Sequence, residues 1–307
     1  MGGASRPSGT TLLRVNGTRA LAVDWSGRAG VDQKNAIYLA EVALETDSLV
    51  RLKNGCTRSQ LVDLLIAEAD NDPNFVVGFD FAFSLPEWYL VSLGLTSVRE
   101  LWALLATETL TPRMREVGLV GWMRAPEPPF WSSTKAASGL ASEQEFRRTE
   151  QELRRPGLQP KSVFQLVGAG QVGRGSLYGM QALHRLSEAG FSVWPFDEPR
   201  FPLVLEVFPR VFAMGTNKSD PAERHRFLKT FEIDGPTAGS ADDNEDAFDA
   251  AVSANAIAGA VRAGELVSLA PDPEYALEGR IWGLPKNTLP RKPSAVLRPL
   301  YTSQTAG

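Results

Sequence analysis

Several carboxylates of this 307-residue chain occur in apolar segments, where burying a charge is costly. Asp24 ends the run LAVD, Asp80 lies within VVGFDFAF, and Glu206 lies within LVLEVF. A carboxylate among apolar residues usually has a charged partner, a hydrogen-bond network or a metal ion. Asp246 and Asp249 form a further group, because a spacing of three residues on a helix places both side chains on nearly one face. These five residues are the first candidates for chemistry.

A divalent metal centre would explain these carboxylates together. Mg²⁺ and Mn²⁺ take oxygen ligands, and two such ions about 3.5–4 Å apart can drive an in-line displacement at phosphorus. Asp24, Asp80, Glu206, Asp246 and Asp249 are the candidate residues for such a centre.

Each carboxylate also has a purely structural interpretation. Asp24 and Asp80 could cap turns, and Glu206 could form an ion pair with Arg210 or another basic residue. The two helical aspartates could be negative charges that the helix dipole favours near an N-terminus. One carboxylate on each expected element favours the metal site over these separate explanations.

The residue types disfavour several other classes of enzyme. The chain has two histidines and no G-x-S-x-G motif, which argues against a Ser-His-Asp hydrolase. It has no G-x-x-x-x-G-K-[ST] motif, which excludes P-loop chemistry. Cys56 is the single cysteine, so neither an intramolecular disulfide framework nor a thiolate zinc cluster can form.

A glycine-rich stretch, VGAGQVGRGSLYGM, contains G-x-G-x-x-G at Gly168, Gly170 and Gly173. The pattern alone is typical of a dinucleotide-binding turn, but that turn belongs to a first strand-helix-strand unit. A second interpretation is a turn beside a substrate cleft, in which backbone N–H groups and Arg174 meet a phosphate. A third is a structural turn. On the second interpretation Gly170, Gly173 and Arg174 are substrate-binding residues.

The elements that must position these residues begin with three strands in series. Residues 20–28, 36–45 and 47–52 have strand patterns, residues 59–70 have helical spacing with Ser59 as a plausible cap, and residues 75–86 form another apolar strand. Serial strands suit an antiparallel meander, and the helix is a plausible crossover to the fourth strand. A doubly wound fold would alternate strand and helix from the start, so this opening argues against one.

After residue 86 the chain alternates irregular segments with a few clear helix and strand patterns. Residues 87–160 are expected to be mostly helical and irregular, and a helix is expected from the glycine turn to about residue 189. Residues 202–212 have the pattern of a strand, and residues 242–264 that of a long helix. We expect residues 1–18 to form a flexible tail and residues 279–307 a basic, proline-containing extension.

Charge and hydropathy constrain the partners. The formal net charge of −4 provides no global basic field for nucleic acid, although a local groove can still be basic. Candidate contacts for a phosphate backbone are Arg147, Arg148, Arg154, Arg155 and Lys161, whose alternative is a solvated helix face. No stretch approaches the ~18 apolar residues of a membrane span, so we expect no membrane partner and a cytoplasmic location. The oligomeric state is not indicated.

The blocks LAVDWSG, VVGFDFAFSLP, FQLVGAGQVGRGSLYGM, VWPFD, LEVFPR and DNEDAFDAAVSA together resemble the family catalogued as domain of unknown function 429. That family is regarded as a predicted nuclease of ribonuclease H-like fold, and the resemblance covers roughly residues 20–265. It implies an α/β domain over residues 19–278, a mixed sheet formed by an antiparallel meander and then helix-strand units, and a mostly helical insertion at about 87–160.

The resemblance also implies an activity. In ribonuclease H-like enzymes an Asp on the first strand, an acid on the fourth strand and an acid on a late helix hold the catalytic metals. At the matching positions here lie Asp24, Asp80 and one or both of Asp246 and Asp249, which the resemblance implies as metal ligands and catalytic residues, with Glu206 as a neighbour that supports the site. The D-x-x-D-A pattern at 246–250 is also similar to the closing motif of the Holliday-junction resolvase branch. The implied function is a Mg²⁺- or Mn²⁺-dependent phosphodiesterase acting on nucleic acid or a nucleotide.

Two other functions remain open from the sequence. Sugar kinases and actin-like ATPases share this sheet topology, and DWSGR is loosely similar to their first phosphate loop, so an ATP-binding phosphotransferase is one alternative. Such enzymes need a second related domain, and the chain contains no internal repeat. The other alternative is a nucleic-acid-binding module without turnover, which the basic segment 279–307 makes credible.

Overall fold

A six-stranded mixed sheet organises the computed structural model, which describes residues 18–28, 30–106, 129–131, 140–166, 172–230 and 238–284. The strand order is β3-β2-β1-β4-β6-β5. The strands are β1 (Arg19–Asp24), β2 (Tyr38–Ala43), β3 (Ser48–Lys53), β4 (Phe75–Phe79), β5 (Ser192–Val193) and β6 (Leu203–Glu206). The protein is therefore of the mixed α/β class.

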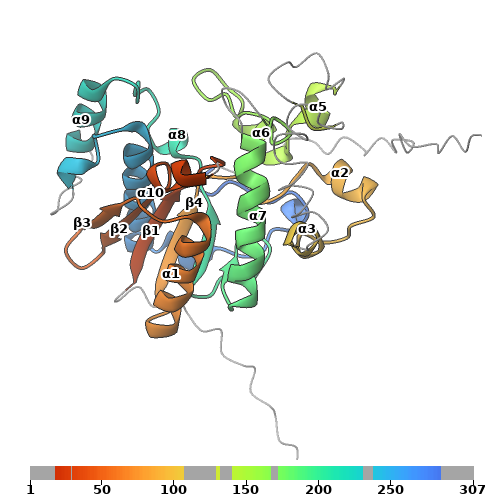
Figure 1. The fold of residues 1–307 in the computed structure, drawn as a ribbon, viewed down its shortest axis with the longest axis horizontal. Coiled ribbons are helices and arrows are strands. Elements are labelled where there is room, and N and C mark those ends of the chain that lie inside the picture. Colours follow the sequence, from red (N-terminus) through yellow and green to blue (C-terminus); the bar gives the residue numbers. More distant parts are fainter. Residues whose placement is uncertain are drawn as a thin grey trace, which may run out of the picture.

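Helices cover both faces of this sheet (Figure 1). The α helices are α1 (Arg58–Asn71), α2 (Glu87–Ser92), α3 (Val98–Ala106), α5 (Ser142–Glu145), α6 (Arg148–Leu153), α7 (Val172–Glu188), α8 (Pro209–Phe212), α9 (Pro221–Thr230) and α10 (Glu245–Arg262). Short 3-10 turns are η1 (Gly30–Asn35), η4 (Ala238–Ser240), η5 (Glu265–Ser268) and η6 (Pro273–Tyr275). Within the described residues no helix is both long and apolar enough to cross a membrane.

The first part of the chain confirms the expected meander and crossover. β1 pairs antiparallel with β2, and β2 pairs antiparallel with β3. Helix α1 then returns the chain so that β4 lies parallel to β1. The cap of α1 differs from the expectation: Thr57, not Ser59, is the N-cap, and its hydroxyl accepts a hydrogen bond from the Gln60 N–H at 3.2 Å. Thr57 and Gln60 form a reciprocal capping box, which satisfies two backbone donors at once.

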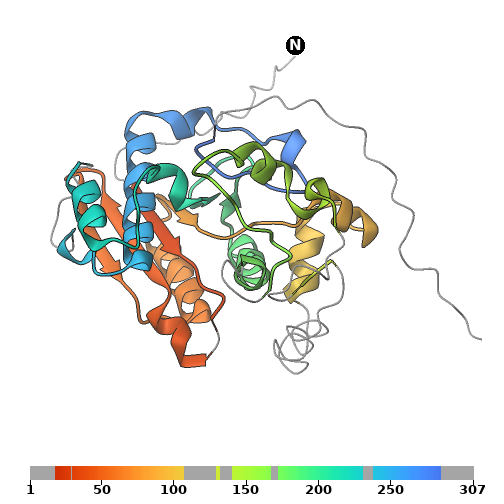
Figure 2. The same cartoon turned by 90° about the horizontal axis from the view of Figure 1, so that it is seen from above.

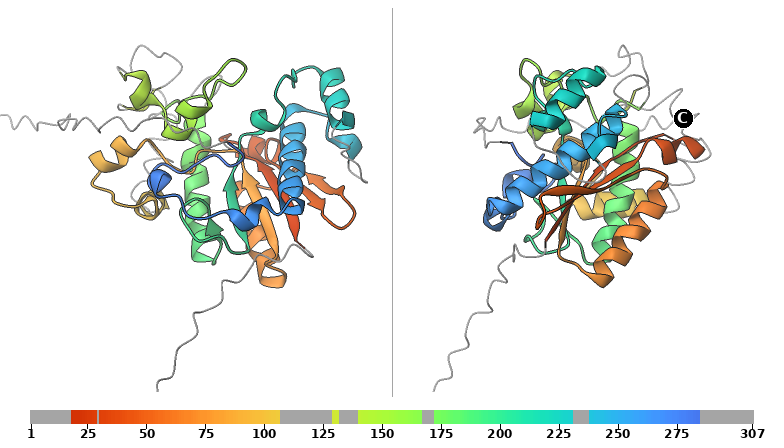
Figure 3. Two further views of the ribbon diagram at one scale, coloured as in Figure 1. Left: turned by 180° about the vertical axis from the view of Figure 1, so that it is seen from behind. Right: turned by 90° about the vertical axis from the view of Figure 1, so that its left-hand side faces the viewer.

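Alternation along the strands separates two apolar layers. Leu21, Val23 and Phe79 face α1, α3 and α7, whereas Ala20 and Ala22 face α10. The right-hand view of Figure 3 shows α10 on one side of the sheet and α1 with α7 on the other. Small side chains line the α10 interface on both partners, so this helix approaches β1 and β4 closely.

β6 is shorter than its apolar pattern predicts. The expected strand over 202–212 ends at Glu206, and α8 begins at Pro209. Proline has no N–H to donate to a strand ladder, whereas its fixed φ suits the first turn of a helix. The chain therefore leaves the sheet directly after Glu206, at the edge where β1 and β4 also end.

The expected helical insertion is partly described. Helices α2, α3, α5 and α6 lie together beyond α7, on the side away from β3 (Figure 2), and α3 packs against α7. Most of the expected tail over residues 1–18 and of the basic extension over residues 279–307 lies outside the described residues. The parts that are described belong to the domain: Thr18 is buried, Ile281 and Trp282 are buried, and the Trp282 N–H donates to the Glu206 carbonyl at 2.8 Å.

The closeness of α10 to the sheet predicts a penalty for adding a methyl group at Gly78. A Cβ there would lie 2.7 Å from Val207 Cγ1 and 2.7 Å from Ile257 Cδ1, and valine has little rotational freedom with which to move away. Gly78→Ala should lower the free energy of unfolding by roughly 1–3 kcal/mol in a chemical denaturation experiment. The matched control is Gly259→Ala on α10, where no atom lies within 4 Å of the new Cβ, and it should be neutral or stabilising by up to about 1 kcal/mol. Equal stability of the two variants would contradict this description of the interface.

Candidate metal centre

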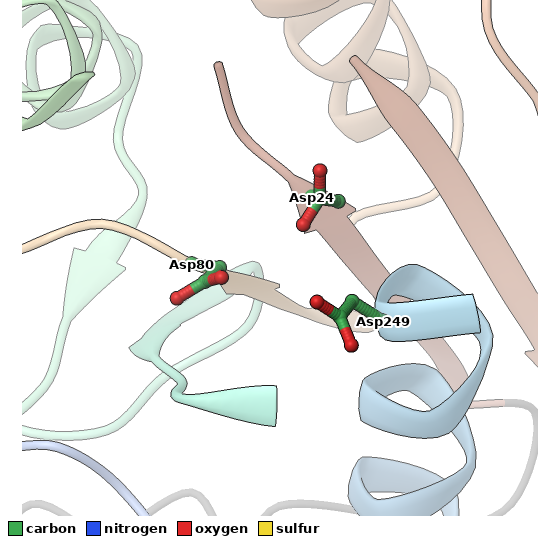
Figure 4. Close-up of side chains that lie close together, drawn as sticks. All are labelled: Asp24, Asp80 and Asp249. Atoms are coloured by element: carbon green, nitrogen blue, oxygen red, sulfur yellow. The ribbon is translucent and has the colours of Figure 1, made fainter. Parts of the chain in front are cut away.

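Three of the predicted carboxylates converge at one edge of the sheet. Asp24, Asp80 and Asp249 each offer a carboxylate oxygen, and these oxygens all lie within 4.8 Å of one another. Figure 4 shows the three side chains pointing toward a common space, from the end of β1, from the end of β4 and from α10. Residues separated by more than two hundred positions in the chain therefore form one acidic group.

The parallel pairing of β1 and β4 positions the first two aspartates. Val23 is paired with Phe79, and the Asp80 N–H donates to the Val23 carbonyl at 3.1 Å, so both strands end at the same level. Side chains alternate along a strand, and Ala22, two residues before Asp24, faces α10. Asp24 and Asp80 accordingly lie on the α10 side of the sheet.

Helix α10 supplies the third aspartate. Its N-cap is Asn244, whose side chain accepts from the Ala247 N–H at 2.8 Å and donates to the Tyr38 hydroxyl at 2.8 Å. The cap thereby holds the start of the helix against β2. Asp249 follows in the second turn with 5% of its surface exposed.

Asp246 differs from the expectation for a metal ligand. It is half-buried on the preceding turn of α10 and does not belong to the group of three carboxylates that the described residues form. Burial raises its pKa, while the positive charges of Arg28 and Lys218 act in the opposite direction. Asp246 therefore lies next to the three clustered carboxylates and is not one of them.

Burial and mutual repulsion disfavour ionisation of all three clustered carboxylates. Burial raises the pKa of Asp80 to about 8, with further contributions from the charges of Asp249 and Glu206, partly offset by Lys218. Burial also raises the pKa of Asp24 well above its usual range, and the charges of Asp249 and Asp80 add to the effect. The pKa of Asp249 is raised by burial in spite of its contact with Lys218. A cation placed among the three oxygens would relieve this repulsion.

Lys218 was missed by the sequence analysis. Its ammonium group forms a hydrogen-bonded ion pair with Asp249 and lies 3.9 Å from Glu245. The residue occurs in the polar turn between α8 and α9, and nothing in the local pattern NKSD distinguishes it from a surface lysine. Only the tertiary structure brings it to the carboxylates.

Glu206 lies on the opposite face of the sheet from the cluster. It is paired with Phe79, one residue before Asp80, so the alternation of side chains directs it away from α10. Its carboxylate accepts from Arg147 at 2.5 and 2.9 Å and from the Phe83 N–H at 3.0 Å. The ion-pair interpretation of Glu206 is confirmed, but with Arg147 in place of Arg210, which donates to the Thr216 carbonyl. Glu206 is not among the three carboxylates that converge, although its charge acts on Asp80.

Arg147 also departs from its expected role as an exposed phosphate contact. Its side chain is 1% exposed and lies between Glu150 and Glu206, to which it donates with most of its guanidinium N–H groups. Lys161, in contrast, is exposed. Lys161, Arg28 and Asp80 line the same pocket of about 340 Å³ at the ends of the parallel strands.

The glycine stretch is described only from Val172 onward, so the predicted substrate-binding residue Gly170, like Gly168, lies outside the described residues. The Gly173 N–H donates to the Gln165 carbonyl at 2.9 Å, and a Cβ on Gly173 would lie 2.8 Å from that oxygen. Arg174 donates through Nε to the Gly27 carbonyl. Close packing against the segment before α7 therefore accounts for Gly173, whereas Arg174 and Gly175 contact Gly27 in the loop after β1.

The chain was also compared with known proteins. No family model matches it, and no curated protein or solved structure is similar enough to count as a relative. The resemblance described from the sequence blocks therefore stays a prediction, and the function must be argued from the geometry of the site.

Proposed function

We propose that this protein is a divalent-metal-dependent phosphodiesterase of ribonuclease H-like fold that acts on nucleic acid or a nucleotide. The observation that carries the proposal is the convergence of Asp24, Asp80 and Asp249 within 4.8 Å. Their elements, the first strand, the fourth strand and a late helix, are those on which the resembled fold holds its metal ligands. The strand order β3-β2-β1-β4 also agrees with that topology.

The donor set fits a hard divalent cation. Three carboxylates supply anionic oxygen ligands without histidine or cysteine, which is the preference of Mg²⁺ and Mn²⁺. Such an ion, when bound, polarises a phosphoryl oxygen and activates an attacking water. In the overall hydrolysis the water oxygen forms a new bond to phosphorus, the ester P–O bond breaks, and the leaving oxygen takes up a proton from solvent.

Two neighbouring features support the same chemistry. Glu206 accepts from the Phe83 N–H and so fixes the segment that follows Asp80, which makes it a positioning residue in this proposal. The pocket beside Asp80 is lined by the exposed cations Arg28 and Lys161, which suit a phosphate-bearing substrate, and also by the ion-paired Arg147, Glu150 and Glu206. Arg147 holds Glu206 in this position, because its guanidinium group forms ion pairs with both Glu206 and Glu150.

A nucleic-acid-binding module without turnover is the second candidate. The observation that favours it is the ion pair between Lys218 and Asp249, which partly neutralises one of the three carboxylates without a metal ion. Saturable binding of nucleic acid that is unaffected by Mn²⁺ would distinguish this candidate from the enzyme.

Asp24→Asn provides the first test of the metal centre. Mn²⁺ should raise the melting temperature of the wild-type protein, because a ligand that binds only the folded state stabilises it. The variant should lose that shift and lose metal-dependent cleavage of single-stranded and duplex oligonucleotides by at least about 10²-fold. Asp63→Asn on the exposed face of α1 is the control and should behave like the wild type. A full Mn²⁺ shift in Asp24→Asn would remove the proposed site.

The raised pKa of Asp80 predicts how stability depends on pH. The folded protein holds the Asp80 proton up to about pH 8, whereas the unfolded chain releases it near pH 4. Without metal, stability should therefore fall as pH rises through this window, because the folded state binds more protons there. Asp80→Asn should be more stable than the wild type at pH 8, by more than about 1 kcal/mol, and equal to it near pH 4.

Chemical denaturation at a series of pH values measures this difference. Mn²⁺ at saturation should reverse the decline in the wild type, since metal binding replaces the proton. Parallel pH profiles for the wild type and Asp80→Asn would show that this carboxyl has an ordinary pKa.

A further inference from the structure

We propose that the Lys218 ammonium group acts as a fixed second cation of the centre, so that the site takes one divalent ion and Lys218 contacts the substrate phosphate. This inference rests on the proposed function and specifies which cations the metal centre contains. It replaces the two-ion arrangement that the sequence predicts. Lys218 would then be a catalytic residue that no motif of the sequence indicates.

The supply of ligands argues for one ion. Two adjacent ions need several shared carboxylates. Among the described residues no fourth carboxylate joins Asp24, Asp80 and Asp249. Asp246 lies outside the group, and Glu206 is on the other face of the sheet in an ion pair with Arg147. Three carboxylates, with water molecules, would suffice to hold one ion.

The location of Lys218 suits a second positive charge. Its ammonium contacts Asp249 directly and interacts electrostatically with Asp24 and Asp80. The side chain is 37% exposed, so part of it faces the solvent from which a substrate arrives. One divalent ion and one ammonium group carry three positive charges, which equal the negative charges of the three carboxylates. The centre is thereby neutral before a phosphate anion binds.

The turn that carries Lys218 is held at several points. The buried guanidinium of Arg224 donates to the Lys218 carbonyl at 2.6 Å and to the Asp242 carbonyl at 2.6 and 3.1 Å. The Asn217 N–H donates to Glu223 at 2.7 Å, and the Ser219 hydroxyl donates to Glu245 at 2.8 Å.

These contacts anchor the turn to both α9 and α10. A cation that must meet a reacting phosphate needs a fixed origin. Arg224 is a positioning residue in this arrangement.

The first experiment is a calorimetric titration of the purified full chain with Mn²⁺ alone. The wild type should bind one ion per chain. Lys218→Met should bind Mn²⁺ roughly tenfold more tightly, because a competing charge beside Asp249 is removed. Lys229→Met, an exposed lysine on α9, is the matched control and should equal the wild type. Circular dichroism checks that each variant is folded.

The second experiment titrates inorganic phosphate into the Mn²⁺-loaded proteins. Lys218→Met should lower the phosphate affinity about tenfold, Lys218→Arg should retain most of it, and Lys229→Met should leave it unchanged. This readout requires no turnover and no known substrate. It separates a contact with phosphate from simple screening of the carboxylates.

The outcomes of these experiments test the role of Lys218 separately from the metal-dependent function. Two Mn²⁺ ions per wild-type chain, or an unchanged phosphate affinity in Lys218→Met, would overturn the role of Lys218 and leave the metal-dependent function intact. Absence of Mn²⁺ binding in the wild type, with Asp24→Asn indistinguishable from it, would overturn both.

Discussion

Burial of three carboxylates close together at one edge of the sheet is the constraint that the surrounding fold must satisfy. Burial raises the pKa of Asp24, Asp80 and Asp249, and the charges of the neighbouring carboxylates add to the effect. Ionisation of the three groups is therefore costly, and the surrounding structure must hold their elements in place against the resulting repulsion. The same repulsion would become binding energy for a cation, which is why the cluster indicates a metal centre more strongly than any single residue does.

The fold holds these charges through packing that is unrelated to them. Parallel pairing of β1 and β4 ends both strands at one level, and the small residues between the sheet and α10 let the helix approach. Asn244 caps the start of α10 and also donates to the Tyr38 hydroxyl on β2. The position of Asp249 is therefore fixed relative to β2 as well. Apolar burial between the sheet and α10 thus opposes electrostatic repulsion at the site.

A second charged group lies directly across the sheet. Glu206, Glu150 and Arg147 satisfy one another with buried hydrogen bonds, and Glu206 also holds the chain after Asp80. The two groups illustrate opposite treatments of buried carboxylates. On one face a fully buried arginine forms ion pairs with two carboxylates; on the other face, among the described residues, Lys218 forms an ion pair with one carboxylate of three.

The sequence by itself determined the meander, the crossover helix and the long helix α10, because hydrophobic periodicity and turn residues are local signals. It also determined which carboxylates were unusual, since a charge inside an apolar run is visible without coordinates. Only the tertiary structure decided that Asp246 stays outside the group and that Glu206 points to the other face. These outcomes depend on strand register, where an offset of one residue reverses a side chain. The contact between Lys218 and Asp249 likewise joins two separate segments, and no hydrophobic periodicity in the sequence indicates it.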